Sequence, residues 1–351
     1  MIQLGDIGDI VWSTPTFHTL KRAYPHASIY VLLRQGSGSL LQADPSITNS
    51  FEVPPSGDNF LTTAATQIHL IRRLRHEHFD LLFDLRADER GAITGFLSGT
   101  TYRVARHFKG PGAPFWRNAL FTHLVHAPEF SPHEHTCGAA EQSLGILRGF
   151  GLAASTTVPK LWVSAVDEQK ISCILVEKGI TERTRWISIN PFSRWSYKEW
   201  NLEKWAAIIE WLYAEQGIVT VLVGARNERE RISKVVEYCS TSAVNLVGAT
   251  SLGELAALLS KSSLHVGVDS AAPHIAAATG TPTVTIYGPS SWKDWAPVGK
   301  THHVIVPSDP CAPCHQKGCN GSGRSRCLEN LEIGRVKEGI QNALAQSVGP
   351  A

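Results

Sequence analysis

Short apolar segments alternate with segments of helical periodicity along this chain, the pattern of a parallel sheet covered on both faces. In the first half, β-branched apolar runs predict strands, and apolar residues at every third or fourth position predict helices. Residues 5–9 form a turn, and residues 159–164 form an extended connector. The strands expected in the first half are 28–33, 81–85 and 101–106, and the helices are 10–24, 59–77 and 136–150.

The second half repeats this alternation more regularly. Its expected strands are 186–190, 218–223, 243–246, 264–268 and 283–287, and its expected helices are 202–215, 228–239, 252–259, 271–278 and 334–345. Right-handed crossovers turn each half into a doubly wound domain that binds ligands at the carboxyl ends of its strands. We therefore expect two Rossmann-like domains around a cleft. The expected division is 1–160, 161–332, and a terminal helix and tail at 333–351.

The tract that follows residues 264–268 carries the strongest chemical signal. An apolar strand runs through Asp269 into a helix whose start is made of small residues, Ser270, Ala271 and Ala272. Small side chains leave the first backbone N–H groups of the helix accessible, and the positive end of the helix dipole lies there. This arrangement suits a diphosphate. An ordinary α/β turn that binds nothing is the alternative interpretation.

The length and charge of the chain indicate its number of domains and disfavour some classes of function. At 351 residues the chain suits two domains, and 33 basic against 31 acidic residues leave no charge excess for wholesale nucleic-acid binding. Residues 91–128, however, contain no Asp or Glu and carry Arg103, Arg106, Lys109 and Arg117. Such a stretch is either a solvated basic face or a site for an anionic acceptor or membrane surface.

The sequence contains no run of 18 apolar residues and no basic, apolar leader, so a cytoplasmic enzyme is the default expectation. Only residues 1–4 precede the first glycine, fewer than a first strand normally needs, so we expect a trimmed or misassigned start.

Four of the seven cysteines cluster at Cys311, Cys314, Cys319 and Cys327. The spacing loosely matches a metal site, but its second half lacks the paired CxxC or HxxxH of a strong zinc motif. Reduced thiols or disulfides in a loop-rich segment are the alternative. We therefore include no metal ligand among the expected site residues.

Two further segments follow strands in ways that suggest chemistry. Asp9 lies at a glycine-punctuated strand-to-helix turn, where a carboxylate either caps the helix or acts as a general base. After residues 186–190 come the Ser193 hydroxyl and the cations Arg194 and Lys198, which would offset charge on a departing diphosphate. The alternative is that these cations are solvated beside core tryptophans.

Glu228, after another strand, either accepts hydrogen bonds from ribose hydroxyls or is an ordinary carboxylate at a helix start.

These segments together resemble one enzyme family. Three motifs occur in order over nearly the whole chain. They are Gly5-Asp6-Ile7-Gly8-Asp9, Ser193-Arg194-Trp195-x2-Lys198-x-Trp200, and Gly267-Val268-Asp269-Ser270-x3-His274 through Tyr287-Gly288-Pro289. They resemble the ADP-heptose–lipopolysaccharide heptosyltransferases, glycosyltransferase family 9. The Arg-Trp-x2-Lys-x-Trp segment looks most like the heptosyltransferase III branch.

The resemblance implies an α/β protein with the GT-B fold, in which the amino-terminal domain binds the acceptor and the carboxy-terminal domain binds the ADP-sugar. It implies that Asp9 is the catalytic base and that Lys198 also takes part in catalysis. The donor contacts it implies are Ser193, Arg194, Lys198, Glu228, Thr250, Asp269, Ser270 and Ala271. The sequence departs from the family pattern at two places. Arg194 stands where other branches have a small hydroxyl residue, and the short first strand leaves Asp9 less firmly placed.

The implied reaction is a single displacement that inverts the anomeric carbon of ADP-L-glycero-D-manno-heptose, with no cofactor and no metal. The implied acceptor is the anionic inner core of lipopolysaccharide, for which we expect Arg103, Arg106 and Lys109 to be contacts. Such an acceptor fits peripheral contact with the cytoplasmic face of the inner membrane.

Competing hypotheses are a non-catalytic nucleotide-sugar or lipopolysaccharide-binding protein and a GT-B nucleotide-sugar epimerase. A dehydrogenase is disfavoured because no Gly-x-Gly-x-x-Gly follows a strand.

Overall fold

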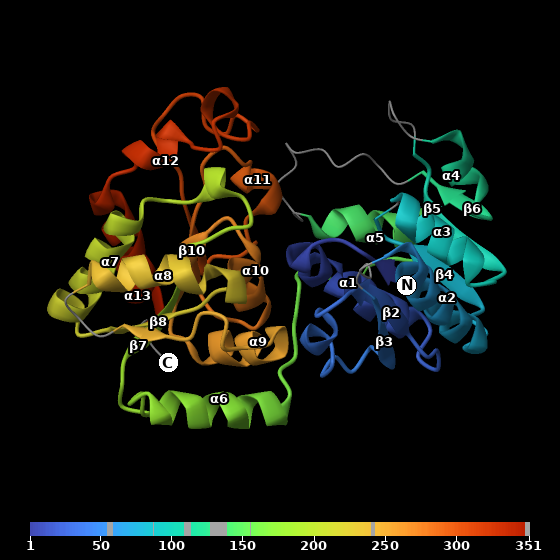
Figure 1. Ribbon diagram of the computed structural model, residues 1–351, viewed down its shortest axis with the longest axis horizontal. Coiled ribbons are helices and arrows are strands. Elements are labelled where there is room, and N and C mark those ends of the chain that lie inside the picture. The colour runs from blue at the N-terminus through green and yellow to red at the C-terminus, as the bar shows by residue number, and fades with distance from the viewer. Residues whose placement is uncertain are drawn as a thin grey trace. The chain divides into compact units, whose positions relative to one another are not determined.

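The computed structural model describes residues 1–54, 59–86, 88–108, 114–126, 139–154, 156–239 and 243–347. The chain divides into two compact units at Pro159–Lys160. Unit 1 contains Met1–Ser131 and Ala139–Pro159, and unit 2 contains Lys160–Ala351. Each unit is built on one six-stranded sheet with helices (Figure 1). The predicted fold class, two doubly wound α/β domains, is confirmed.

The sheet of unit 1 is entirely parallel. Its strands are β1 (Ile2–Gln3), β2 (Tyr30–Arg34), β3 (Asn49–Val53), β4 (Leu81–Asp84), β5 (Tyr102–Arg106) and β6 (His123–Val125). They are ordered β3-β2-β1-β4-β5-β6. Because the order reverses between β1 and β4, the loops after these two strands diverge and open a crevice at the carboxyl edge.

The helices of unit 1 cover both faces of this sheet. They are α1 (Ile7–Ala23), α2 (Phe60–His76), α3 (Glu89–Leu97), α4 (Phe115–Ala119) and α5 (Ala140–Gly149). Helices α1 and α5 pack against each other. Right-handed crossovers then place α2 and α3 on the opposite face. There Leu70 and Leu74 of α2 close a core with Ile2, Leu32 and Phe51.

Unit 2 has the same strand topology. Its strands are β7 (Trp186–Asn190), β8 (Val219–Leu222), β9 (Val244–Asn245), β10 (His265–Val268), β11 (Thr283–Ile286) and β12 (His302–Ile305). The order β12-β11-β10-β7-β8-β9 reverses between β7 and β10. The loops after β7 and β10 therefore frame the ligand-binding position of a doubly wound sheet.

Eight helices are described in unit 2. They are α6 (Ala165–Glu177), α7 (Leu202–Gln216), α8 (Arg229–Glu237), α9 (Leu252–Lys261), α10 (Ala271–Ala278), α11 (Trp292–Trp295), α12 (Arg326–Asn330) and α13 (Ile333–Ser347). Local chemistry sets their ends: the Asn201 side chain accepts hydrogen bonds from the first turn of α7, and Gly217 ends that helix with a φ of 63°. Helix α13 packs on α7, β11 and β12.

Several predicted boundaries were wrong. Helix α1 begins at Ile7 rather than residue 10, because Asp6 is its N-cap and Asp9 already lies in its first turn. Strands β3, β6 and β12 were not predicted, since they are short edge strands that contain polar residues. The segment 226–228, expected to be split between a loop and the start of a helix, is a 3₁₀ turn (Arg226–Glu228) before α8. Helix α10 has the bounds that the sequence predicted.

The first strand is short, and β1 contains only Ile2 and Gln3. It nevertheless pairs with β2 on one side and β4 on the other. The described residues include no helix that is long and apolar enough to cross a bilayer.

The core of unit 2 can be tested at α7, which carries one fully buried and one exposed aromatic side chain. Trp205 has no exposed surface and packs edge-to-face on Trp200 with ring centroids 5.2 Å apart. We expect Trp205→Ala to lower the free energy of unfolding by about 3–5 kcal/mol, measured by urea denaturation. Tyr213→Ala, on the exposed face of the same helix, should change it by less than about 0.5 kcal/mol. Equal effects would contradict the assigned faces.

Candidate functional site

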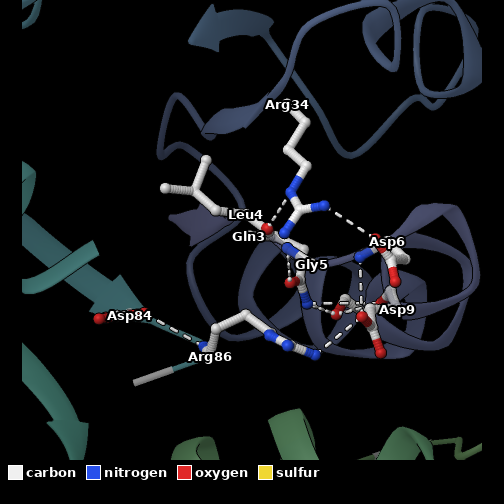
Figure 2. Close-up of polar contacts among 9 residues, drawn as sticks. Gln3, Leu4, Gly5, Asp6, Asp9, Arg34, Asp84 and Arg86 are labelled. Atoms are coloured by element: carbon white, nitrogen blue, oxygen red, sulfur yellow. Dashed lines mark hydrogen bonds and ion pairs between the residues drawn. The ribbon is translucent and has the colours of Figure 1, made fainter. Parts of the chain in front are cut away.

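Asp9 lies in the first turn of α1, at the carboxyl end of β1 (Figure 2). Its side chain folds back over Gly5. A Cβ atom at position 5 would lie 2.4 Å from Asp9 Oδ2, so only glycine leaves room for the carboxylate there. The glycine before the helix therefore sets where the carboxylate lies.

Two donors converge on one oxygen of Asp9. The backbone N–H of Asp6 donates to Oδ2 at 2.8 Å, and Arg86 Nη1 donates to the same atom at 2.8 Å (Figure 2). Among the described residues, none donates a hydrogen bond to Oδ1. The carboxylate is thus held in one orientation with one oxygen still able to accept a proton.

The surroundings of Asp9 have opposing effects on the pKa of its carboxyl group. Burial raises the pKa of the Asp9 carboxyl above its ordinary value, while the Arg86 charge and the hydrogen bond from Asp6 lower it. The net effect is a raised pKa, which favours proton acceptance nearer neutral pH.

A second arginine fixes the loop that leads into α1. Arg34, at the end of β2, donates from Nε to the Leu4 carbonyl at 2.6 Å and from Nη1 to Asp6 Oδ1 at 2.8 Å. The Arg86 backbone N–H donates to Asp84 Oδ1 at 3.1 Å. Sequence reasoning did not identify Arg34 or Arg86. Their only sequence signal is that each stands where a β-strand ends.

The arginines of the basic stretch mostly hold the backbone of unit 1. Arg103 Nε donates to the Leu120 carbonyl at 2.8 Å, and its guanidinium lies 5.4 Å from the centre of the Phe96 ring. Arg106 Nη2 donates to the Gln142 carbonyl at 3.2 Å. Arg117 is buried. Lys109 lies outside the described residues. The acceptor role of Arg103, Arg106 and Lys109 remains a prediction.

In unit 2, the ends of β7 and β10 bring four predicted donor residues together. Lys198 Nζ contacts Asp269 Oδ2 at 2.7 Å, and Ser193 Oγ donates to the Asp269 carbonyl at 3.0 Å. Ser270 Oγ donates to Asn190 Oδ1 at 3.4 Å. Asp269 and Ser193 are buried, whereas the Lys198 side chain keeps some exposure. This cluster presents a cation at the carboxyl edge of the sheet.

The start of α10 lies beside that cluster. Ser270 is the N-cap residue, but its side chain makes no capping hydrogen bond to the helix. Ala271 and Ala272 form the first positions, and Pro273 has no N–H to donate. No capping side chain therefore occupies the Ala272 N–H, and the N–H groups at this helix start are available to an anion.

Two buried aromatic groups near Asp269 were part of the motif but had no predicted role. Burial lowers the pKa of His274 to about 4, with a raising effect from Asp269 and a lowering one from Lys198. Burial, followed by the Asp269 charge, raises the pKa of Tyr287. Both side chains are therefore neutral at neutral pH, and Lys198 and Asp269 carry the charges of this cluster.

The remaining predicted donor residues lie outside the cluster. The Arg194 guanidinium is exposed and lies 5.3 Å from the centre of the Trp195 ring. Glu228 Oε2 accepts from the Ala225 N–H at 2.7 Å, and a Cβ at Gly224 would lie 2.5 Å from that oxygen. Burial raises the pKa of Glu228. Thr250 lies in the loop before α9, next to its N-cap Ser251.

The cysteine cluster forms neither a disulfide nor a ligand set within the described residues. Cys311, Cys314, Cys319 and Cys327 are free thiols. No group of three His, Cys, Asp or Glu side chains in the described part of the chain is placed to hold a metal ion.

Sequence comparison connects this geometry to known proteins. The profile of glycosyltransferase family 9 (heptosyltransferase) matches residues 67–323. The chain is 27% identical to lipopolysaccharide heptosyltransferase 3 of Escherichia coli over 294 residues, which covers 82% of this chain and 84% of that protein. The same enzyme of strain K12 is 26% identical over 83% of this chain and 82% of its own length.

Solved structures share the fold. A family 9 glycosyltransferase from Veillonella parvula superimposes with a TM-score of 0.83 at 19% identity, covering 98% of this chain and 96% of that one. ADP-heptose lipopolysaccharide heptosyltransferase II of E. coli gives 0.78 at 21% identity, covering 98% of each chain. E. coli heptosyltransferase WaaC, solved with ADP-2-deoxy-2-fluoro heptose, gives 0.71 at 18% identity over 97% of this chain and 98% of that one.

The contacts of Asp9 predict how its titration responds to its neighbours. We expect Arg86→Gln to raise the pKa of Asp9 further, because the variant loses the largest of the charges that lower it. Carbon-detected NMR titration of the carboxyl group measures this shift. Arg34→Gln removes a cation that pairs with Asp6 instead, so its effect on Asp9 should be in the same direction and smaller. A fall in the Asp9 pKa in either variant would contradict the assignment.

Proposed function

We propose that this chain, which belongs to glycosyltransferase family 9, transfers heptose from ADP-L-glycero-D-manno-heptose to a hydroxyl of the lipopolysaccharide inner core. The observation that carries the proposal is the family match over residues 67–323, which spans Lys198, Asp269 and the start of α10. The similarity to lipopolysaccharide heptosyltransferase 3 over four-fifths of both chains supports the choice of donor and acceptor.

In this proposal the donor binds at the carboxyl edge of unit 2. The diphosphate meets Lys198, Ser193 and the amide groups of Ser270 and Ala271, and Asp269 accepts from sugar hydroxyls. The cluster around the Lys198–Asp269 ion pair supports this assignment, because it joins a cation to a helix start with uncapped amides. The outer donor contacts are Arg194 at the phosphates or sugar, Glu228 at the ribose, and the Thr250 backbone at adenine.

The proposed reaction is a single displacement with Asp9 as general base. Asp9 Oδ1 takes the proton of the acceptor hydroxyl while that oxygen bonds to the anomeric carbon, and the bond from this carbon to ADP breaks on the opposite face. The anomeric configuration inverts. The fixed orientation of the Asp9 carboxylate, with two donors on Oδ2, supports this role.

Departing ADP gains negative charge, which protein groups would stabilise in place of a divalent metal. Lys198 and the positive end of α10 are suited to this, since both are fixed before the reaction begins.

We assign acceptor binding to unit 1, with Arg103, Arg106 and Lys109 as contacts for anionic core groups. Since that acceptor is lipid-linked, the enzyme would work in the cytoplasm in peripheral contact with the inner membrane. An ADP-release assay tests the function. Release of ADP that depends on the acceptor supports transfer, and release of ADP without acceptor supports an epimerase-like or hydrolytic enzyme. Binding of the ADP-sugar without release of ADP supports a binding protein.

Asp9→Asn tests the base. The amide keeps the shape of the carboxylate but accepts a proton far less readily, so turnover should fall by roughly two to four orders of magnitude while ADP-sugar affinity stays nearly constant. Steady-state kinetics and calorimetry measure the two quantities. Asp6→Asn is the matched control, because Asp6 also forms an ion pair at the start of α1. If Asp9→Asn kept more than about a tenth of the turnover, Asp9 would be a helix-start residue only.

Lys198→Ala tests stabilisation of the leaving group. We expect weaker ADP-sugar binding and a rate about two orders of magnitude lower, because the ammonium meets more charge as ADP departs. Lys170→Ala, which breaks the ion pair with Glu254 elsewhere in unit 2, should leave both unchanged. Unaltered kinetics in Lys198→Ala would overturn the assignment.

Activity should persist in excess EDTA. Complete loss with EDTA and recovery with Mg²⁺ would overturn the metal-independent departure of ADP.

A further inference from the structure

The outer layer of unit 1 exposes large apolar side chains that its core does not use. Within the described residues, every exposed Leu, Ile and Phe side chain lies between Phe60 and Phe108. The exposed apolar side chains of unit 2 are instead scattered Val and Tyr residues and one Trp. Scattered exposed apolar residues are ordinary, but a concentration on one layer indicates a binding surface.

Helix α2 carries much of this surface along one stripe. Leu61, Ala65, Ile68 and Arg72 recur at helical spacing on the side opposite the buried Leu70 and Leu74, and all four are exposed. Leu61 is 76% and Ile68 is 52% exposed. The stripe therefore begins apolar and becomes basic toward the end of the helix.

The end of helix α3 lies close to the last turn of α2. Arg75 Nε of α2 donates to the Leu97 carbonyl at the end of α3 at 2.8 Å. Ile93, Phe96 and Leu97 are exposed there, and Tyr102 follows at the start of β5. We call this surface, made of Leu61, Ile68, Arg72, Arg90, Ile93, Phe96, Leu97 and Tyr102, the α2–α3 face.

The charge on the α2–α3 face has one dominant sign. Helix α2 contains Arg72, Arg73 and Arg75 and no acidic residue, and residues 90–108 contain Arg90, Arg103 and Arg106 and no acidic residue. The acidic neighbours are Asp88 and Glu89 at the start of α3, and Glu77 and Asp80 after α2. Apolar side chains beside arginines match an anionic bilayer, which offers hydrocarbon below and phosphate at its surface.

We propose that the α2–α3 face docks unit 1 on an anionic phospholipid bilayer. Leu61, Ile68 and Phe96 enter the boundary between headgroups and acyl chains, and Arg72 and Arg90 pair with lipid phosphates. The proposal deepens the proposed function, on which it rests for the membrane-anchored acceptor. The residues proposed to contact the membrane belong to the α2–α3 face, and Asp9, the proposed general base, is not one of them.

Vesicle co-sedimentation of the full chain tests the surface. Wild-type protein should bind phosphatidylethanolamine vesicles containing a quarter phosphatidylglycerol, and it should bind phosphatidylcholine vesicles far less. The double variant Leu61→Ser/Ile68→Ser should lose most of the binding. Arg72→Glu/Arg90→Glu should weaken it at least 25-fold, since each surface arginine contributes about fivefold in affinity, and added salt should narrow the difference.

Matched controls use the other unit. Val166 and Val176 of α6 are 75% and 63% exposed, so Val166→Ser/Val176→Ser removes comparable apolar surface away from the α2–α3 face. Lys178→Glu/Arg183→Glu makes the same charge change at exposed positions. Both controls should bind vesicles like wild type.

Activity assays with two forms of the acceptor test membrane docking separately from the proposed function. With water-soluble, deacylated core oligosaccharide, the α2–α3 variants should turn over like wild type, and with acceptor embedded in anionic vesicles their rate should fall about tenfold or more. Failure of wild type to use either acceptor would overturn the proposed function but not the vesicle binding.

Three results would overturn the proposal. In the first, wild-type protein binds neutral and anionic vesicles equally well. In the second, the α2–α3 variants bind vesicles like wild type. In the third, light scattering shows that wild-type protein is an oligomer and that the Leu61→Ser/Ile68→Ser variant is a monomer. The last result would make the α2–α3 face a self-association surface.

Discussion

The candidate site depends on a steric constraint that both units share: a glycine at the end of a strand leaves space for a carboxylate four residues later. Asp9 fills that space over Gly5, and Glu228 fills it over Gly224. In each case the carboxylate accepts a hydrogen bond from the residue after the glycine, and burial raises its pKa. Each doubly wound unit thereby holds an acidic group at the edge where such sheets bind ligands.

The sequence was sufficient for the fold class because doubly wound sheets bury their central strands on both faces. Residues 186–190 and 264–268 read as apolar runs for that reason, and β7 and β10 form there. Strand β3 alternates polar and apolar residues at the sheet edge, so no continuous apolar run indicated it. The start of α1 was misplaced because Gly8, a poor helix former, lies within its first turn.

Candidate residues could be chosen from the sequence where a strand end coincides with a recognisable motif, as at Asp9, Lys198 and Asp269, and their roles stay predictions. Arg86 could not be chosen in this way, because its contact with Asp9 exists only when β4 lies beside β1, and strand order is not encoded locally. Counting charges located the basic stretch but could not show what its side chains contact. Arg103 and Arg106 add positive charge to the sequence total, yet each donates to a backbone carbonyl.

The ion pair between Lys198 Nζ and Asp269 Oδ2, at 2.7 Å, determines how this cluster would receive a diphosphate. An isolated buried ammonium would be costly to desolvate, and the carboxylate offsets that cost while fixing the lysine in place. Because the neighbouring His274 and Tyr287 stay neutral, the charges that this cluster would present to an incoming diphosphate are those of the Lys198–Asp269 pair, beside the α10 amides. The charge that grows on the leaving phosphate would then be met by donors that need not reorganise, the condition under which electrostatic stabilisation is greatest.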